Sequence, residues 1–181
     1  MADRETQGDT NDLLSALIVP FTLPPAVARV RSAWDFAAQR GVVPHVTILF
    51  PFVPCADLVP AVRPELAAIA LAVPAFEVRF ERVRRFPELV WVEPDPAEPF
   101  TALTAAVVRR WPDHLPYGGE FEIVIPHLTV VESGAAPLEA VERIATRSTP
   151  FTAQASRLEL WCQDAAGRWR PRWRMPFGVR P

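Results

Sequence analysis

Apolar residues recur along this chain in two rhythms, which together predict a mixture of strands and helices. Apolar positions that repeat every third or fourth residue indicate amphipathic helices, whereas short apolar runs and strict alternation indicate strands. The first rhythm predicts helices near residues 27–37 and 99–111, while abundant Ala and Leu over residues 57–73 and a proline that can open a helix at 137–147 predict two more. The second rhythm predicts strands near residues 13–23, 45–53, 75–83, 89–94, 121–132, 157–163 and 168–177.

The order of these predicted elements repeats along the chain. Each half contains a strand, a helix, a second strand, a second helix and a third strand, and one further strand closes the sequence. This order suggests a duplication, and it predicts an α+β fold of two similar lobes about a pseudo-two-fold axis. Residues 13–181 contain no linker and are expected to form one domain, whereas the polar residues 1–12 are expected to be disordered.

Composition narrows the possible functions. Half of the 181 residues are hydrophobic, 22% are charged and the formal net charge is −2, so the overall charge does not indicate a surface for nucleic acids or membranes. No segment has the pattern of a secretory signal or a membrane span, and we expect a cytoplasmic, monomeric protein. Cys55 and Cys162 lie far apart, and their positions suggest neither a disulfide framework nor a metal site.

One phrase occurs twice. The chain reads "VVPHVTILF" from Val42 and "VIPHLTVVE" from Val124. The pair His45 and Thr47 therefore recurs 82 positions later as His127 and Thr129. Only three histidines occur in the whole sequence, and two of them occupy this repeated setting. Two copies in matching strands of a duplication favour a functional role over a chance repeat.

Strand geometry places the polar residues of each copy on one face. Because alternate side chains point to opposite faces, His45, Thr47 and Leu49 are predicted to share a face, and Phe50 is predicted on the other. The second copy repeats the arrangement. If the two copies meet across a cleft, two imidazoles and two hydroxyl groups converge there.

Such a set suits the cleavage of a phosphodiester. One imidazole can activate the incoming oxygen as a base while the other protonates the departing oxygen as an acid. The hydroxyl groups of Thr47 and Thr129 can donate hydrogen bonds to the phosphate oxygens. The set itself does not require a metal ion or another cofactor, and we expect neither.

Two other interpretations of the histidines remain open. A duplication can preserve a purely structural histidine twice. A zinc site would need further ligands, and the third histidine, His114, lies beside Asp113 in a predicted loop where we expect it to be solvated.

With these motifs the chain resembles the 2H phosphoesterase superfamily, which includes 2′-5′ RNA ligase-like proteins and cyclic phosphodiesterases. The matching features are "PHVTILFPF", "RRFPELVWVEPDPAEPFTALTAAV", "PYGGEFE", "PHLTVVE" and "RWRMPFG". The resemblance implies a bilobal fold in which antiparallel sheets line a central cleft, with helices on the outside. It also implies hydrolysis of 2′,3′-cyclic phosphates, or the reversible joining of RNA ends through 2′-5′ linkages.

The resemblance also implies roles for individual residues. His45 and His127 would be the acid and the base, respectively, and Thr47 and Thr129 would hold the phosphate. The sequence departs from the family pattern at "LFPF" after the first motif and at Glu132, where some relatives carry a basic side chain. Both departures concern the substrate and not the four motif residues.

Other residues are candidates for substrate contact. Tyr117, in the loop before the second motif, could contact a base or sugar. Arginines also cluster, and in one cluster they alternate with tryptophans; the members are Arg82, Arg84, Arg85, Arg168, Trp169, Arg170, Arg172, Trp173 and Arg174. These side chains could bind RNA, or they could form a solvated face with the tryptophans in the core.

These observations support one main hypothesis and two alternatives. The main hypothesis is a metal-independent phosphoesterase that acts on the 2′,3′-cyclic phosphate of RNA or a nucleotide, with possible 2′-5′ ligase activity. The first alternative is a non-catalytic protein that binds a nucleotide or phosphate ligand in the same cleft. The second is an enzyme for a small cyclic diester that is not RNA.

Overall fold

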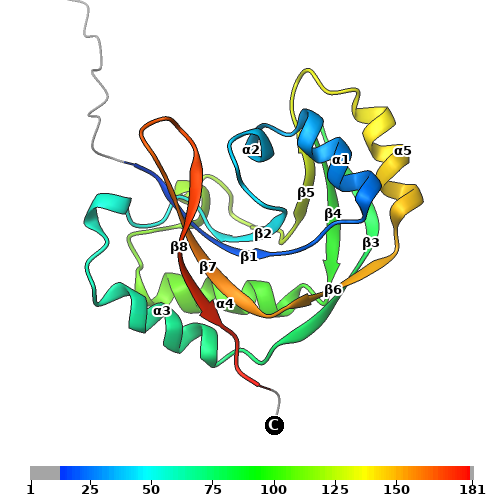
Figure 1. The fold of residues 1–181 in the computed structure, drawn as a ribbon. Helices are drawn as coiled ribbons and strands as arrows, with labels where there is room; N and C mark the ends of the chain where they lie inside the picture. The colour runs from blue at the N-terminus through cyan, green and yellow to red at the C-terminus, as the bar shows by residue number, and fades with distance from the viewer. Residues whose placement is uncertain (1–12, 180–181) are drawn as a thin grey trace, which may run out of the picture.

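The computed structural model describes residues 13–179, so the expected disorder of residues 1–12 lies outside the described residues. The strands are β1 (Ser15–Pro20), β2 (His45–Leu49), β3 (Phe76–Phe86), β4 (Leu89–Asp95), β5 (Leu128–Glu132), β6 (Phe151–Ala155), β7 (Arg157–Gln163) and β8 (Trp169–Pro176). The helices are α1 (Pro25–Trp34), α2 (Phe36–Gln39), α3 (Val62–Leu71), α4 (Glu98–Arg110) and α5 (Leu138–Ser148), with short 3₁₀ turns at Cys55–Asp57 and Pro116–Gly119. Strands and helices are interspersed along the chain, except that β3 is followed directly by β4 and the chain ends with β6, β7 and β8 (Figure 1).

The strands form a single curled sheet. Its order is β6-β3-β4-β5-β2-β1-β7-β8, and each neighbouring pair is antiparallel. The sheet curves into a half-barrel (Figure 1). The prediction of an α+β fold with antiparallel strands lining a cleft is therefore confirmed.

The pseudo-two-fold axis passes between β2 and β5, the two strands that carry the repeated motif. On one side lie β2, β1, β7 and β8, against which α3 and α4 pack; on the other lie β5, β4, β3 and β6, against which α1 and α5 pack. Each half-sheet contains strands from both halves of the sequence. The half-sheet of β1 and β2 is completed by β7 and β8 from the end of the chain, and the half-sheet of β5 and β6 is completed by the earlier strands β3 and β4. The two lobes therefore exchange elements and do not correspond to the two halves of the chain.

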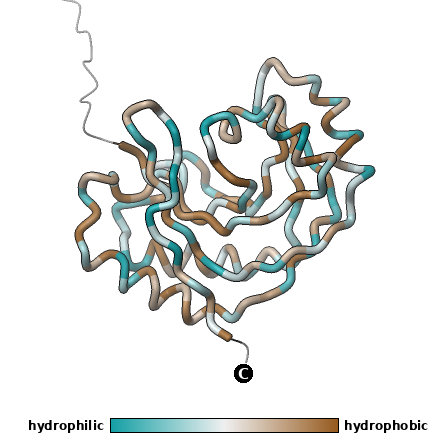
Figure 2. The backbone as a smooth tube through the Cα atoms, viewed as in Figure 1, coloured by the Kyte–Doolittle hydropathy of each residue, from teal (hydrophilic) through white to brown (hydrophobic). Residues whose placement is uncertain are grey.

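The buried apolar residues form two clusters, one on each face of β1. One large cluster of buried residues joins the sheet to the helices and includes Leu17, Val46, Phe80, Leu103 and Leu128. Figure 2 shows hydrophobic and hydrophilic residues interspersed along the strands and helices. A smaller cluster of Ala16, Ile18 and Trp161 lies apart from the main core. Because Ala16 and Ile18 alternate with Leu17, this smaller cluster occupies the opposite face of β1.

Several predicted boundaries were wrong. The helix expected near residues 27–37 is broken at Asp35, which is extended and whose side chain accepts a hydrogen bond from the Ala38 amide at the start of α2. The strand expected over residues 121–132 begins only at Leu128, after Pro126, which has no amide hydrogen to donate to a ladder. Strand β6 was not predicted, because the alternation in that segment is loose.

Strand β2 contains a β-bulge that overturns part of the predicted facing. Thr47 and Leu49 both have partners on β1, but Ile48 between them has none. After this extra residue the alternation shifts by one position. Leu49 is therefore buried in the main core with Ile48, and Phe50 packs instead with the smaller cluster. The prediction that Leu49 shares the face of His45 was wrong.

Strand β5 contains the same irregularity at the equivalent position. Thr129 pairs with Trp91 of β4 and Val131 pairs with Val90, whereas Val130 between them has no partner. Both residues after the threonine are again buried. A bulge at the same place in both copies supports the inferred duplication more strongly than the short sequence identity does.

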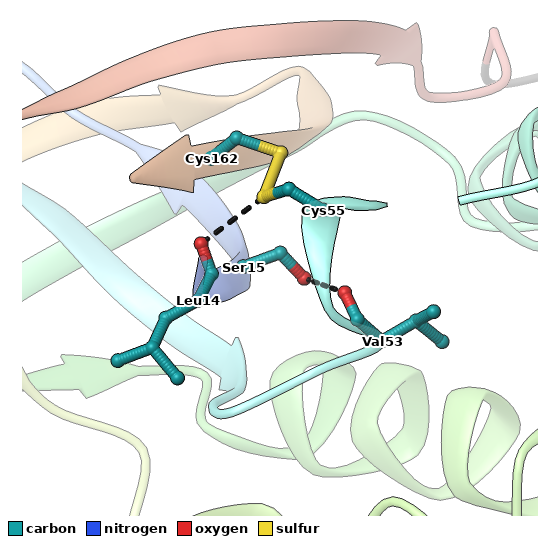
Figure 3. The surroundings of a disulfide bond; sticks show 5 residues. All are labelled: Leu14, Ser15, Val53, Cys55 and Cys162. Atoms are coloured by element: carbon teal, nitrogen blue, oxygen red, sulfur yellow. Dashed lines mark hydrogen bonds between the residues drawn. A yellow bond between two sulfur atoms is a disulfide. The ribbon is translucent and has the colours of Figure 1, made fainter. Parts of the chain in front are cut away.

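A disulfide bond joins Cys55 and Cys162, contrary to the prediction (Figure 3). Their Cα atoms lie 5.9 Å apart although 107 residues separate them. The reason is topological: the amide of Cys55 donates to the Leu13 carbonyl, and Cys162 pairs with Ser15, so both cysteines flank the start of β1. Structural disulfides are rare in a reducing cytosol, so this bond does not support the expected cytoplasmic location.

Candidate functional site

Strands β2 and β5 bring the two motifs side by side at the centre of the sheet. Val46 pairs with Leu128 across these antiparallel strands. Continued by one residue in each direction, this register sets His45 opposite Thr129 and His127 opposite Thr47. Each histidine thus neighbours the threonine of the other motif, on the face away from the main core.

The two imidazoles are anchored in the same way. Nδ1 of His45 lies 2.8 Å from the carbonyl oxygen of Val43, and Nδ1 of His127 lies 2.7 Å from that of Ile125. A carbonyl oxygen only accepts, so each Nδ1 carries the hydrogen and donates it. The Nε2 atoms are therefore the nitrogens left to exchange protons with a ligand.

All five residues predicted for the site line one cavity of about 890 Å³. They are His45, Thr47, Tyr117, His127 and Thr129. The structure thus brings the two motifs and the loop before the second motif together around a single space, as the sequence predicted. Their roles in binding or catalysis stay predictions.

Thr47 links the first histidine to Tyr117. Its hydroxyl oxygen lies 3.1 Å from Nε2 of His45, and since Nδ1 holds the ring hydrogen, the threonine is the donor. Tyr117 also interacts with the Thr47 side chain, although burial, the larger influence, raises the pKa of the tyrosine. Tyr117 has a φ of 52°, in the left-handed region that non-glycine residues rarely adopt. Such local strain is typical of residues whose side chain must point into a site.

Burial changes the acid–base behaviour of His45. It lowers the pKa of His45 to about 4, because desolvation disfavours the imidazolium form. The hydrogen bond to Val43 opposes this change, and the charges of Arg31 and His127 add to it. In the ligand-free protein His45 is therefore neutral at neutral pH.

A buried ion pair beside the motifs was not predicted. Arg31 of α1 lies 2.9 Å from Asp35, and the side chains are 3% and 0% exposed. Arg31 also donates to the carbonyl oxygen of Thr129 at 3.0 Å and to that of Val42 at 3.4 Å. It therefore ties the second motif strand to the segment that leads into the first.

Asp35 completes this connection. One of its carboxylate oxygens accepts from the Glu132 amide at 3.0 Å, and the other accepts from Ala38. The sequence carried a signal for the pair: Arg31 falls four residues after Val27, on the apolar side of the predicted helix, with an acid four residues further on. An arginine in an apolar stripe needs a buried partner.

Most of the predicted arginine clusters are held by carboxylates outside the cavity. Arg82 and Arg84 both pair with Glu93, and Arg85 pairs with Glu142. Of the other cluster, Arg174 pairs with the buried Glu159, Arg170 approaches Asp164, and Trp173 packs against the main core. Trp169 differs, since it lines the cavity with Phe50. The solvated-face alternative therefore describes most of these residues.

His114 lies apart from the motif histidines. It lies in the expected loop and is half-buried, with its ring centroid 5.7 Å from that of Phe52, so it is only partly exposed to solvent. It does not line the cavity. Among residues 13–179, no group of three or more histidine, cysteine, aspartate or glutamate side chains is arranged to hold a metal ion.

Comparison with known proteins identifies the family. A sequence profile of the 2′-5′ RNA ligase superfamily matches residues 19–167. No curated protein sequence matches the chain significantly. Within the described residues, no helix is both long and apolar enough to cross a bilayer.

Solved structures show the same fold at low sequence identity. Apo E. coli LigT is 15% identical with a TM-score of 0.54, and the alignment covers 92% of this chain and 99% of that one. E. coli LigT complexed with 3′-AMP is 14% identical with a TM-score of 0.52, over 92% and 99% of the chains. The protein TT0787 of Thermus thermophilus is 16% identical with a TM-score of 0.52, over 93% and 100%.

Proposed function

Because this chain belongs to the 2′-5′ RNA ligase superfamily, we propose that it is a metal-independent phosphoesterase that hydrolyses a 2′,3′-cyclic phosphate. His45 and His127 exchange the protons, and Thr47 and Thr129 hold the phosphate. One observation carries the proposal: both imidazoles are anchored through Nδ1 to a backbone carbonyl and both histidines line one cavity, so that Nε2 is the proton-exchanging nitrogen of each. Purely structural histidines would not need the same anchoring twice around one space.

The chemical step follows from this pair of nitrogens. The base takes a proton from water at its Nε2 while the water oxygen bonds to phosphorus. The bond from phosphorus to one ribose oxygen breaks, and the acid donates its Nε2 proton to that oxygen. Thr47 and Thr129 donate hydrogen bonds to the non-bridging oxygens, where negative charge accumulates.

The low pKa of His45 constrains how it can be the acid. The resemblance assigns the acid to His45 and the base to His127, yet His45 is neutral in the ligand-free protein. A bound phosphate anion raises the pKa of a neighbouring imidazole, because it favours the charged form. We propose that His45 gains its proton together with the substrate, and that Thr47 then turns its hydroxyl from His45 to the phosphate.

Calorimetry tests this coupling. Binding of a nucleoside 2′- or 3′-monophosphate at pH 6.5, measured in buffers of different ionisation enthalpy, should show net proton uptake. The uptake should vanish in His45→Gln and persist in His114→Gln, which changes the histidine outside the cavity. Binding without proton uptake would reverse the assignment and make His45 the base.

A substrate panel tests the activity itself. Nucleoside 2′,3′-cyclic phosphates, 2′-5′ dinucleotides and 3′-5′ dinucleotides are incubated with the protein, and the products are identified by phosphorus NMR. We expect a phosphomonoester from the cyclic phosphates, with a rate that is insensitive to chelator. Cleavage or formation of a 2′-5′ linkage would add ligase activity. Measurable affinity without any product would support the non-catalytic alternative.

A further inference from the structure

Exposed apolar side chains gather at the mouth of the motif cavity. Within residues 13–179, six of the large apolar side chains with high exposure line this single cavity. They are Leu14, Phe36, Phe86, Phe121, Ile123 and Ile125. Single exposed apolar residues are ordinary, but a group around one cavity marks a binding surface. We call these six residues the apolar rim.

The segment before the second motif supplies half of the apolar rim. Phe121, Ile123 and Ile125 alternate in sequence but form no strand, and Ile123 is 77% exposed. The sequence predicted a strand here, in which such residues would be buried. The structure leaves them in solvent beside the histidines, where burial would come only from a bound ligand.

Charge around the cavity is balanced. Its charged lining residues, apart from the histidines, are Arg31, Asp35, Arg40 and Glu132, so two positive groups face two negative groups. Arg31 is committed to Asp35, and the guanidinium of Arg40 lies 4.2 Å from the ring centre of Phe36. The cavity therefore has one phosphate-binding centre, formed by the motifs, and walls that are otherwise largely apolar.

RNA would require a different lining. Proteins that bind single-stranded nucleic acids combine stacking aromatic residues with a basic groove that follows the phosphates. Aromatic residues are present here, including Trp161 and Trp169. The basic groove is missing from the described lining, and the arginines of the β3 cluster pair with Glu93 and Glu142 elsewhere.

We propose that the substrate of this site is a small cyclic diester with a single phosphate and one large uncharged substituent, and not the phosphorylated end of an RNA chain. This inference rests on the phosphoesterase function proposed above. A cavity of about 890 Å³ is within the range that holds a compact organic ligand. The substituent is a flat or apolar group that covers the apolar rim, either a nucleoside without further phosphates or an alkyl or aryl group.

Two substrate series test the inference and distinguish a nucleoside substituent from an alkyl or aryl substituent. The first contains adenosine 2′,3′-cyclic phosphate, its 5′-phosphorylated form and a four-nucleotide RNA that ends in a cyclic phosphate. The second contains the cyclic phosphates of ethylene glycol, phenylethanediol and 1,2-octanediol. We expect kcat/KM to fall about tenfold or more when phosphates are added in the first series. In the second series it should rise on the order of tenfold or more with apolar area.

The two series also identify the substituent. If the adenosine compound exceeds the phenyl and octyl compounds, the substrate is a nucleoside cyclic phosphate; the reverse order identifies an alkyl or aryl diester. Both results support the inference. Equal or faster hydrolysis of the tetranucleotide relative to adenosine 2′,3′-cyclic phosphate would overturn it.

A pair of variants links the preference to the apolar rim. Ile123→Arg places a charge on the rim, whereas Leu71→Arg places the same charge on α3, at a residue that is 65% exposed and outside the cavity. Ile123→Arg should lower the ratio of octyl to unsubstituted kcat/KM about tenfold and improve the relative use of the tetranucleotide. Leu71→Arg should leave both ratios as in the wild type, and equal ratios in the two variants would overturn the inference.

Binding measurements distinguish this inference from the proposed function. Affinities for both series are measured by calorimetry on His127→Ala, which keeps all six side chains of the apolar rim. A preference for uncharged substituents without turnover by the wild type would keep the inference about the ligand and overturn the phosphoesterase. Turnover by the wild type with a preference for RNA would do the opposite.

Discussion

The two motifs are the same phrase in the same local structure, yet their surroundings differ. Both histidines donate from Nδ1 to the carbonyl two residues earlier, and both threonines precede a bulge. The cross-strand partner of the threonine differs: Ile18 faces Thr47, whereas Trp91 faces Thr129 and also packs against the His127 ring, 5.7 Å away between centroids.

Their electrostatic and covalent settings differ as well. Burial lowers the pKa of His45, with a further contribution from Arg31. The loop after the first motif is tied to β7 through Cys55, and the described residues provide no corresponding link after the second motif. The comparison teaches that the repeated sequence determines which ring nitrogen can exchange a proton, while the burial of His45 lowers how readily that imidazole accepts one.

The largest expected effect comes from removing the shared feature. His45→Ala or His127→Ala should lower kcat by about 10²–10⁴-fold, because each change removes one proton-transfer group. The matched control is His114→Ala, which removes a half-buried histidine outside the cavity. Circular dichroism should show folded protein in all three variants. Full activity in the double His45→Ala, His127→Ala variant would contradict the proposed function.

The buried ion pair of Arg31 and Asp35, which contacts both motif segments, should have a large effect on stability. Asp35→Ala leaves the guanidinium of Arg31 buried without its carboxylate, and this should lower the free energy of unfolding by about 3–5 kcal/mol. The measurement is urea unfolding followed by tryptophan fluorescence. Glu81→Ala removes the partner of Arg79 in an exposed pair, and should lower the free energy of unfolding far less, because water and salt screen exposed charges. Similar losses in the two variants would mean that Arg31 and Asp35 are not a coupled buried pair.

The disulfide supports only the side of the first motif. Cys55→Ser combined with Cys162→Ser should lower the free energy of unfolding by about 2–4 kcal/mol, because the bond closes a long loop in the unfolded chain. The free energy of unfolding is compared for the oxidised wild type, the reduced wild type and the double variant. The reduced wild type and the double variant should have the same free energy of unfolding. An unfolding midpoint that does not respond to reductant would show that the bond does not form in solution.

The smallest expected effect is the pH dependence of stability from His45. Its pKa falls from 6.5 in the unfolded chain to about 4 in the folded protein, so the unfolded state binds more protons between these values. Stability from this residue is complete above pH 6.5 and should decrease by about 2–3 kcal/mol as the pH falls to 4. The difference between wild type and His45→Gln isolates this contribution from that of the carboxylates. Parallel stability profiles would show that His45 is not desolvated.

Local features of the fold were accessible from the sequence because they depend on neighbouring residues. The alternation around His45 and His127 predicted two strands, the apolar stripes predicted α1 and α4, and composition and an opening proline predicted α3 and α5, all near their observed positions. The expected alternation failed at the bulges after Thr47 and Thr129. A bulge arises where one strand has an extra residue relative to its partner, and the pairing of two distant strands is not visible in either segment alone. The strand prediction also failed for the segment before β5, which alternates like a strand but contains Pro126, a residue with no amide hydrogen for a ladder.

The sequence by itself determined the class of fold, the repeated motif and the candidate site residues, because strand periodicity and the chemistry of histidine and threonine are properties of short segments. Only the tertiary structure decided that the lobes exchange strands, that Cys55 meets Cys162, and that Arg31 and Asp35 lie buried beside the motifs. It also decided that the apolar residues before the second motif remain exposed around a cavity of balanced charge. These outcomes depend on contacts between segments far apart in the chain, and the folded neighbours set the solvation and charge of each group.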